Sequence, residues 1–145
     1  LNERIWKLKQ DYTVQLIKGL ILKKDYVKQV ECVKRLKSEG YKLACASNSI
    51  MQTLNLMLDC AGYTPYLDFI ISNEAVTWPK PNPEIFLRSI IHFGMCPKEC
   101  LIVEDSEVGC EAAINSGAFL MKVESPNDIE YERIKMYTNF IDNNT

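Results

Sequence analysis

The sequence lacks several features that would assign it to a common functional class. Its apolar runs fall well short of the ~20 residues that a membrane-spanning helix needs, and its net charge of −2 gives no electrostatic basis for binding nucleic acid or an anionic membrane. It contains no P-loop, no G-x-G-x-x-G and no G-x-S-x-G, so nucleotide-binding and serine-hydrolase functions have no support. We therefore expect neither a nucleic acid nor a membrane among its partners.

Ligands for a zinc ion are also scarce. The only histidine is His92, and the closest of the six cysteines, Cys96 and Cys100, do not form a C-x-x-C. A zinc site at that pair would need two more ligands. Most of the cysteines lie within apolar runs, which is typical of reduced, buried thiols. This usage predicts a cytoplasmic protein.

Short apolar segments alternate with amphipathic ones along the chain. The expected strands are 43–46, 69–71, 101–103 and 119–123, and the expected helices are 3–22, 26–38, 50–60, 107–116, 129–138 and one that starts at Asn82-Pro83-Glu84 and stops at Gly94. Apolar strands that alternate with helices predict an α/β fold, a Rossmann-like open parallel sheet with helices on both faces. Ligands bind such sheets beyond the carboxyl ends of the strands.

Polar residues follow two of the predicted strands at that edge. Ser47 and Asn48 come after strand 43–46, where a hydroxyl, an amide and nearby backbone N–H groups can receive an anionic oxygen. Glu104 and Asp105 come after strand 101–103, repel each other and have no obvious local cation, an arrangement that suits Mg²⁺. Both pairs also have a structural interpretation, because such residues commonly cap the next helix.

A third polar element lies between these two. Lys80 stands between two prolines, which restrict the backbone on either side of it. A lysine held in this way can place a point charge on a phosphate oxygen. Lysines in proline-rich surface loops are common, so the loop alone does not establish a site.

Taken in order, these segments resemble motifs of the haloacid dehalogenase superfamily, in its branch of phosphatases and β-phosphoglucomutase-like enzymes. The matching stretches are 42–49, 71–76 with 79–86, and 100–109, and the resemblance covers residues from about 25 to about 125. It implies that Ser47 hydrogen-bonds the transferring phosphoryl group, with Asn48 beside it in substrate binding. It also implies that Lys80 neutralises charge on the phosphate and the nucleophile. Finally, it implies that Glu104 and Asp105 help to hold Mg²⁺.

The family's first motif, Asp-x-Asp-x-Thr or Val, is missing. No aspartate in the sequence has another aspartate two residues later, and the nearest form, Asp105-Ser106-Glu107, already belongs to the metal motif. The resemblance therefore implies that residues 1–22 are a remnant of the helical cap and residues 23–145 a partial α/β core. The first strand and most of the cap would be absent. The nucleophile would then lie outside this chain, which alone is expected to be inactive.

The missing strand also bears on stability. In the family it lies between the strand that ends near Ser47 and the strand that ends near Glu104. Each buried backbone group left unpaired costs roughly 1–3 kcal/mol. We expect the chain to pair these two strands directly, to take a strand from a second chain or a missing N-terminal segment, or to be marginally stable.

Three functional hypotheses follow. The first is the C-terminal part of a Mg²⁺-dependent phosphatase that acts on a small phosphorylated metabolite through an aspartyl-phosphate. The second is a β-phosphoglucomutase-like phosphomutase, and the third is a non-catalytic module that binds phosphate or a partner. The cap largely sets substrate choice in this family, so the sequence does not identify the phosphate ester.

Overall fold

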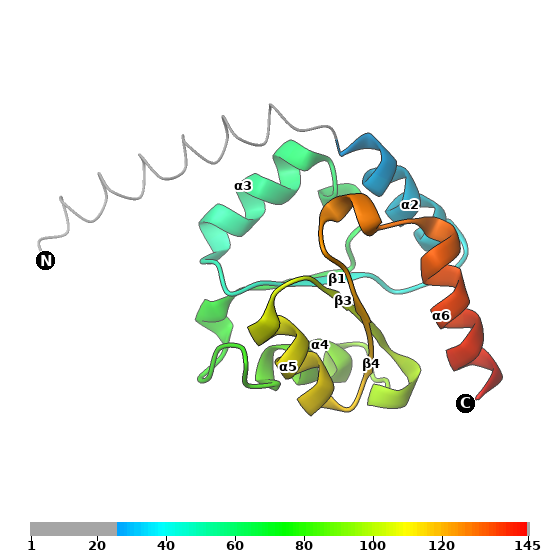
Figure 1. The fold of residues 1–145 in the computed structure, drawn as a ribbon. Coiled ribbons are helices and arrows are strands. Elements are labelled where there is room, and N and C mark those ends of the chain that lie inside the picture. The colour runs from blue at the N-terminus through cyan, green and yellow to red at the C-terminus, as the bar shows by residue number, and fades with distance from the viewer. Residues whose placement is uncertain (1–25, 145) are drawn as a thin grey trace, which may run out of the picture.

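A computed structural model describes residues 26–144 of the chain (Figure 1). The predicted helix 3–22 and the proposed cap remnant 1–22 lie outside the described residues. The helices are α2 (Val27–Ser38), α3 (Met51–Ala61), α4 (Glu84–His92), α5 (Glu107–Ser116) and α6 (Tyr131–Asn143). The strands are β1 (Ala44–Ala46), β2 (Phe69–Ile71), β3 (Leu101–Glu104) and β4 (Phe119–Lys122).

The helix boundaries follow from local sequence in most places. The Ser106 side chain caps α5 by accepting a hydrogen bond from the Gly109 N–H at 3.0 Å, and α5 ends at Gly117, whose φ of 84° is left-handed. The predicted start of α4 needs a correction, because Pro83 and not Asn82 is the residue before the first helical turn. Asn82 still contributes, since its Oδ1 accepts the Glu84 N–H at 2.9 Å.

The four strands are all parallel to their neighbours but form two separate sheets. β1 pairs with β2 with Cys45 opposite Ile70, and β3 pairs with β4 with Ile102 opposite Leu120. This confirms the predicted α/β fold of parallel strands. Within residues 26–144 no ladder joins β1 to β3, so the four strands do not make one continuous sheet. Direct pairing of these two strands, one of the three expected alternatives, is therefore not found in the described part of the chain.

Two apolar clusters hold helices against both faces of the strands. The first joins the two sheets to α4 and α5, which lie together on one side of the strands (Figure 1), and includes Ile71, Ile85 and Ile102. The second lies between α2, α6 and β4 and includes Leu36 and Met121. Because the first cluster takes residues from β2 and from β3, the layer formed by α4 and α5 connects the two sheets through packing.

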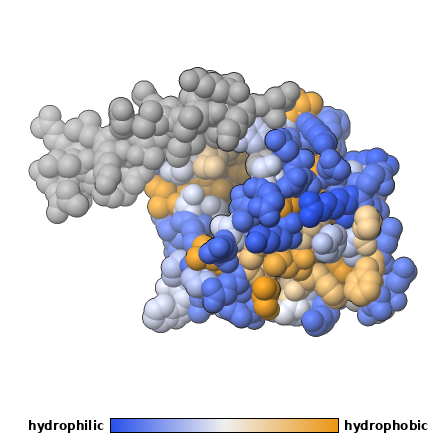
Figure 2. Space-filling model, in the orientation of Figure 1, coloured by the Kyte–Doolittle hydropathy of each residue, from blue (hydrophilic) through white to orange (hydrophobic). Residues whose placement is uncertain are grey.

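The surface is mainly polar. Figure 2 shows a largely hydrophilic face that hydrophobic areas interrupt, and the exposed large apolar side chains include Ile91 on α4, Ile114 on α5 and Met136 on α6. These residues lie on three different helices. Across residues 26–144 no helix has the length and apolar character needed to cross a membrane.

Candidate functional site

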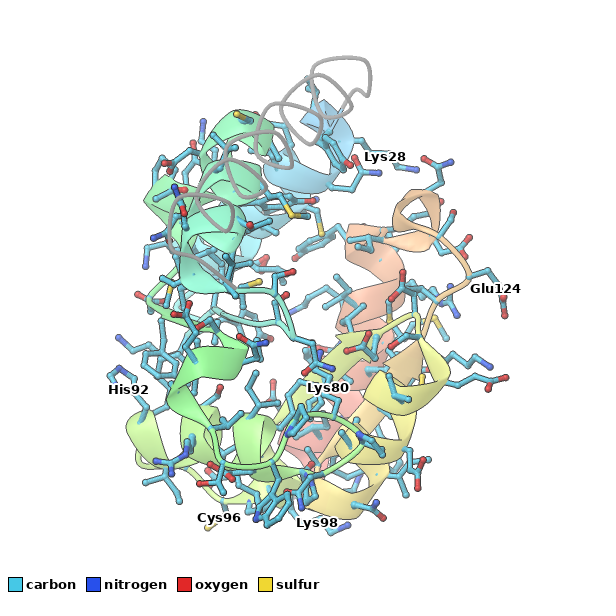
Figure 3. The ribbon with its side chains drawn as sticks, turned by 90° about the vertical axis from the view of Figure 1, so that its left-hand side faces the viewer. Lys28, Lys80, His92, Cys96, Lys98 and Glu124 are labelled. Atoms are coloured by element: carbon cyan, nitrogen blue, oxygen red, sulfur yellow. The ribbon has the colours of Figure 1, made fainter. Side chains whose placement is uncertain are left out.

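The carboxyl ends of β1 and β3 meet at Lys80. Its ammonium donates hydrogen bonds to the carbonyl oxygen of Ala46, the last residue of β1, at 3.0 Å, and to Oε2 of Glu104, the last residue of β3, at 2.9 Å. Figure 3 shows Lys80 near the centre of the molecule, between the green elements and the yellow and orange ones. The Lys80 side chain is only 8% exposed and that of Glu104 12%. One ammonium therefore bridges the two sheets at the predicted edge.

Glu104 is surrounded by donors. Besides Lys80, its carboxylate accepts hydrogen bonds from the backbone N–H of Asp105 at 3.2 Å and from the hydroxyl of Ser106 at 3.3 Å. Burial opposes ionisation, but the hydrogen bond and charge of Lys80, helped by backbone donors, outweigh it and hold the pKa of Glu104 below its usual value. The expectation that the acidic pair lacks a nearby cation is therefore wrong for Glu104.

Asp105 differs from its neighbour. It is exposed, and its carboxylate makes no hydrogen bond or ion pair to any other residue in 26–144. No group of three or more histidine, cysteine, aspartate or glutamate side chains gathers within that range, so the described residues offer at most this pair of carboxylates to a metal. Mg²⁺ commonly binds through one or two carboxylates together with waters and substrate phosphate oxygens. The carboxylates of Glu104 and Asp105 therefore fit part of the ligand set of a magnesium site.

Ser47 and Asn48 lie directly after Ala46. The Ser47 hydroxyl oxygen accepts the Ser49 N–H at 3.1 Å, which leaves the hydroxyl proton available to a ligand. The Asn48 side-chain oxygen accepts the backbone N–H of Lys80 at 3.3 Å. Asn48 therefore holds the lysine loop against the end of β1, a role that the sequence did not indicate. The structure brings the predicted residues Ser47, Asn48 and Lys80 to one edge.

Two contributors to this edge were missed by sequence reasoning. One is Glu84, which was noted only as a residue favoured at a helix start. Its carboxylate accepts the backbone N–H groups of Thr77 and Trp78 in the loop before Lys80. The other is Gly109 in α5, which is buried beside Glu104.

Gly109 leaves room for the Glu104 carboxylate. A Cβ built on Gly109 would lie 2.1 Å from Cδ and 2.4 Å from Oε2 of Glu104, so a side chain there and the observed position of Glu104 exclude each other. The sequence signals are a glycine inside a helix, where alanine would be favoured by about 1 kcal/mol, and its place at the end of the matching stretch 100–109.

We predict that Gly109→Ala folds but displaces Glu104 from Lys80. The new Cβ meets the end of a flexible side chain and no backbone, so the carboxylate moves away and loses the ammonium. The pKa of Glu104, followed by carboxyl NMR titration, should rise toward about 4.3, the ordinary value for glutamate. Asn115→Ala, an exposed change in the same helix, is the control for helix propensity. An unchanged Glu104 pKa in Gly109→Ala would contradict the steric account.

The depressed pKa of Glu104 also predicts a pH dependence of stability. In the acid range the unfolded chain binds the proton that folded Glu104 does not, so stability rises with pH there. The contribution is complete above the unfolded pKa of about 4.3 and is lost as pH falls through the lower folded value. Urea titrations measure the difference in unfolding free energy between the natural sequence and Glu104→Gln. This difference should shrink as the pH falls from above the unfolded pKa of Glu104 to below its folded pKa. A difference that does not change with pH would refute it.

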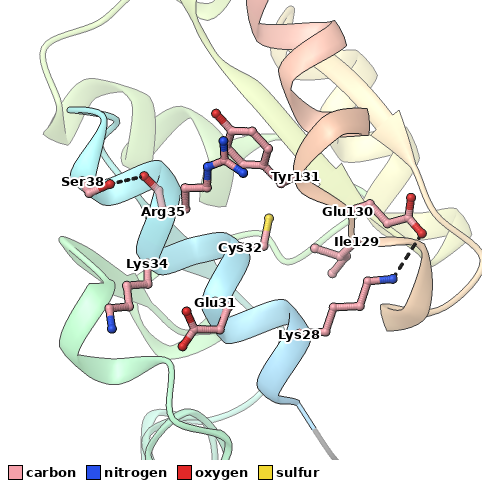
Figure 4. Close-up of a pocket in the computed structure, with 9 residues that line it drawn as sticks. All are labelled: Lys28, Glu31, Cys32, Lys34, Arg35, Ser38, Ile129, Glu130 and Tyr131. Carbon is pink, nitrogen blue, oxygen red and sulfur yellow. Dashed lines mark hydrogen bonds and ion pairs between the residues drawn. The ribbon is translucent and has the colours of Figure 1, made fainter.

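A pocket of about 490 Å³ lies elsewhere, between α2 and residues 129–131 (Figure 4). Three of its charged groups make contacts: Lys28 pairs with Glu130 at 3.2 Å, and the Arg35 guanidinium lies 3.6 Å from the centre of the Tyr131 ring. None of the predicted site residues lines it. The pocket is therefore separate from the candidate site.

Comparison with known proteins agrees with the predicted family and fold. A family model described as haloacid dehalogenase-like hydrolase matches residues 2–123, and the chain belongs to this family of hydrolases. A phosphoglycolate phosphatase of Nitrosococcus oceani is 33% identical over 78 residues, 54% of this chain and 35% of that protein. The phosphoglycolate phosphatase of Aquifex aeolicus is 30% identical over 98 residues, 68% of this chain and 46% of that protein.

Similarity to solved structures supports the same family and fold. The crystal structure of a β-phosphoglucomutase from Clostridium difficile matches with a TM-score of 0.75 and 25% identity over 94% of this chain and 66% of that one. These findings confirm the predicted family, its phosphatase and β-phosphoglucomutase-like branch, and the Rossmann-like fold. The chain spans less than half the length of the two phosphoglycolate phosphatases that it matches.

Proposed function

We propose that the whole protein is a Mg²⁺-dependent phosphatase that acts on a small phosphate monoester. The observation that carries this proposal is the ammonium of Lys80, held between Ala46 and Glu104 at the ends of two strands. Ser47 adjoins one of these contacts and Asp105 the other. The similarity to phosphoglycolate phosphatases supports the reaction class.

Each residue at the edge has a role in this proposal. Lys80 neutralises charge on the phosphate and on the attacking group, and the Ser47 hydroxyl donates a hydrogen bond to a phosphoryl oxygen. Asp105, whose carboxylate bonds to no other residue of 26–144, would hold the metal, with Glu104 beside it as the second carboxylate of the site. When bound, Mg²⁺ supplies positive charge to the phosphoryl oxygens.

The nucleophile belongs, in this proposal, to a strand that lies between β1 and β3. Ala44 and Val103 support it, because both are apolar strand residues, yet Ala44 is exposed and Val103 is 36% exposed. A missing N-terminal segment or a second chain would provide the strand. An aspartate oxygen on it would attack phosphorus, the ester P–O bond would break, and the alcohol would leave with a proton from a general acid. Water would then hydrolyse the acyl phosphate and release inorganic phosphate.

A phosphomutase is the second candidate, because the similar structure from Clostridium difficile is a β-phosphoglucomutase. A mutase returns the phosphoryl group to another hydroxyl of a sugar phosphate, whereas a phosphatase passes it to water.

We further propose that the protein works in the cytoplasm, in keeping with its six cysteines, all of which are free thiols.

The test is phosphate release by the protein purified from its natural source. A panel of small phosphate monoesters is assayed with Mg²⁺ and with a chelator, and the intact mass of the same sample is compared with 16.7 kDa. The proposal predicts Mg²⁺-dependent release and a larger mass or a second chain. Isomerised sugar phosphate without release would indicate a mutase. Phosphate binding without any turnover would indicate a non-catalytic module.

A further inference from the structure

We propose that Glu84 is a positioning residue that sets the location of the Lys80 ammonium. The importance of this role for catalysis rests on the proposed function, but the contacts that define the role do not depend on it. Glu84 is the first residue of α4, and its backbone belongs to the layer that packs on both sheets. Its side chain turns back toward the loop that precedes Lys80. It therefore links a rigid helix to the loop that carries the ammonium.

The contacts of the Glu84 carboxylate are specific. Its Oε1 accepts the N–H of Trp78 at 3.1 Å, and the N–H of Thr77 is shared between Oε1 at 3.1 Å and Oε2 at 3.0 Å. Arg88, one turn further along α4, donates from Nε to Oε2 at 2.8 Å. The hydrogen bonds from Arg88 and from the Thr77 N–H lower the pKa of Glu84 most, and the Trp78 N–H lowers it further. Burial acts in the opposite direction and is outweighed, so these contacts favour the charged carboxylate.

Nothing in the side chains of the loop replaces this anchor. Thr77, Trp78 and Pro79 are all exposed, and Trp78 retains 62% of its accessible surface. The segment just before Lys80 is therefore held by backbone hydrogen bonds to Glu84, with no buried apolar side chain of its own. Asn48 holds the loop at only one further point, the backbone N–H of Lys80.

Loss of the Glu84 acceptors would release the loop two residues before Lys80. The ammonium would then no longer be confined to the position between Ala46 and Glu104. A misplacement of about 1 Å in a reacting group costs roughly 100-fold in rate. The charge of Lys80 would also act less strongly on Glu104, so the pKa of that carboxyl reports where the ammonium lies.

The experiment compares Glu84→Gln with the natural sequence in the whole protein by amide exchange and carboxyl NMR titration. Glutamine has nearly the same shape, but its neutral oxygen is a weaker acceptor than a carboxylate oxygen, and its NH2 group cannot accept the Thr77 N–H as Oε2 does. We expect exchange at Thr77 and Trp78 to accelerate about tenfold or more, the factor for loss of a charged acceptor, and the pKa of Glu104 to rise. Phosphatase turnover should fall roughly 100-fold.

Arg88→Gln is the matched control, because it removes the ion pair but leaves both acceptors for the loop. It should leave amide exchange at Trp78 and the Glu104 pKa close to those of the natural sequence. If Glu84→Gln does not fold, Glu84→Asp is the second variant, because it keeps the charge but is one methylene too short to reach the loop. It should give the same faster amide exchange and the same rise in the pKa of Glu104. Unchanged exchange and an unchanged Glu104 pKa in a folded Glu84 variant would overturn the proposal. Absence of phosphatase activity in the natural protein would count against the proposed function only, since the NMR readouts do not need turnover.

Discussion

Replacement of Lys80 by methionine is expected to abolish phosphatase activity and to destabilise the fold. Methionine keeps the length of the side chain but removes the charge, which leaves the Glu104 carboxylate buried without its cation. Removal of one partner of a buried ion pair costs ~3–5 kcal/mol, and we expect about 3 because Glu104 keeps donors from Asp105 and Ser106. Urea unfolding at neutral pH measures this loss.

A double variant separates the two effects of Lys80. In Lys80→Met with Glu104→Gln, the uncompensated charge is gone, so most of the lost stability should return. Activity should stay absent, because the phosphate has lost its point charge. A single Lys80→Met variant with unchanged stability would contradict the bridge between the two sheets. An active double variant would contradict the catalytic role.

Substitution of Asp105 by asparagine is expected to remove Mg²⁺-dependent turnover without unfolding the protein. Asp105 is exposed and bonds through its side chain to no other residue of 26–144, so stability should change by about 0.5 kcal/mol or less. Loss of metal-based charge stabilisation, worth several kcal/mol, should lower the rate roughly 1,000-fold or more. Titration calorimetry with Mg²⁺ should show weaker binding in parallel.

Glu111→Gln provides the control for Asp105. It removes an equal charge from an exposed position on α5, one turn beyond the start of that helix, and should leave both Mg²⁺ affinity and turnover unchanged. Equal effects of the two substitutions would point to a general electrostatic influence and not to a ligand. Turnover of Asp105→Asn at the natural rate would remove the metal assignment.

The sequence predicts the fold well where local pattern decides it. The wholly apolar segments 69–71 and 101–103 correspond to β2 and β3, and the helix stop at Gly117 is where predicted. Which strands pair is a different question, because strand partners depend on residues far apart in the chain. Nothing in the apolar pattern of 43–46 or 101–103 reveals that these strands stay unpaired with each other.

The same distinction applies to the site. Ser47 and Asp105 could be found from residue type and position after a strand, and Lys80 from its place between two prolines, since phosphate and Mg²⁺ require those groups. The pairing of Lys80 with Glu104 could not be predicted, because the two residues are 24 positions apart and only the fold brings them together. Glu84 acts through a side chain that folds back on its own loop. Gly109 acts through an absent side chain, and such an effect is visible only in three dimensions.

The most direct test of the central claim is an NMR titration of the isotope-labelled natural protein with orthophosphate in the presence of Mg²⁺. The claim is that Ser47, Lys80 and Asp105 form one site for phosphate and metal. It predicts that resonances of all three residues shift together and saturate at a common phosphate concentration. It also predicts that the shifts at Ser47 vanish in Lys80→Met. Shifts confined to the pocket between α2 and residues 129–131, or different saturation at Ser47 and Asp105, would contradict a single site.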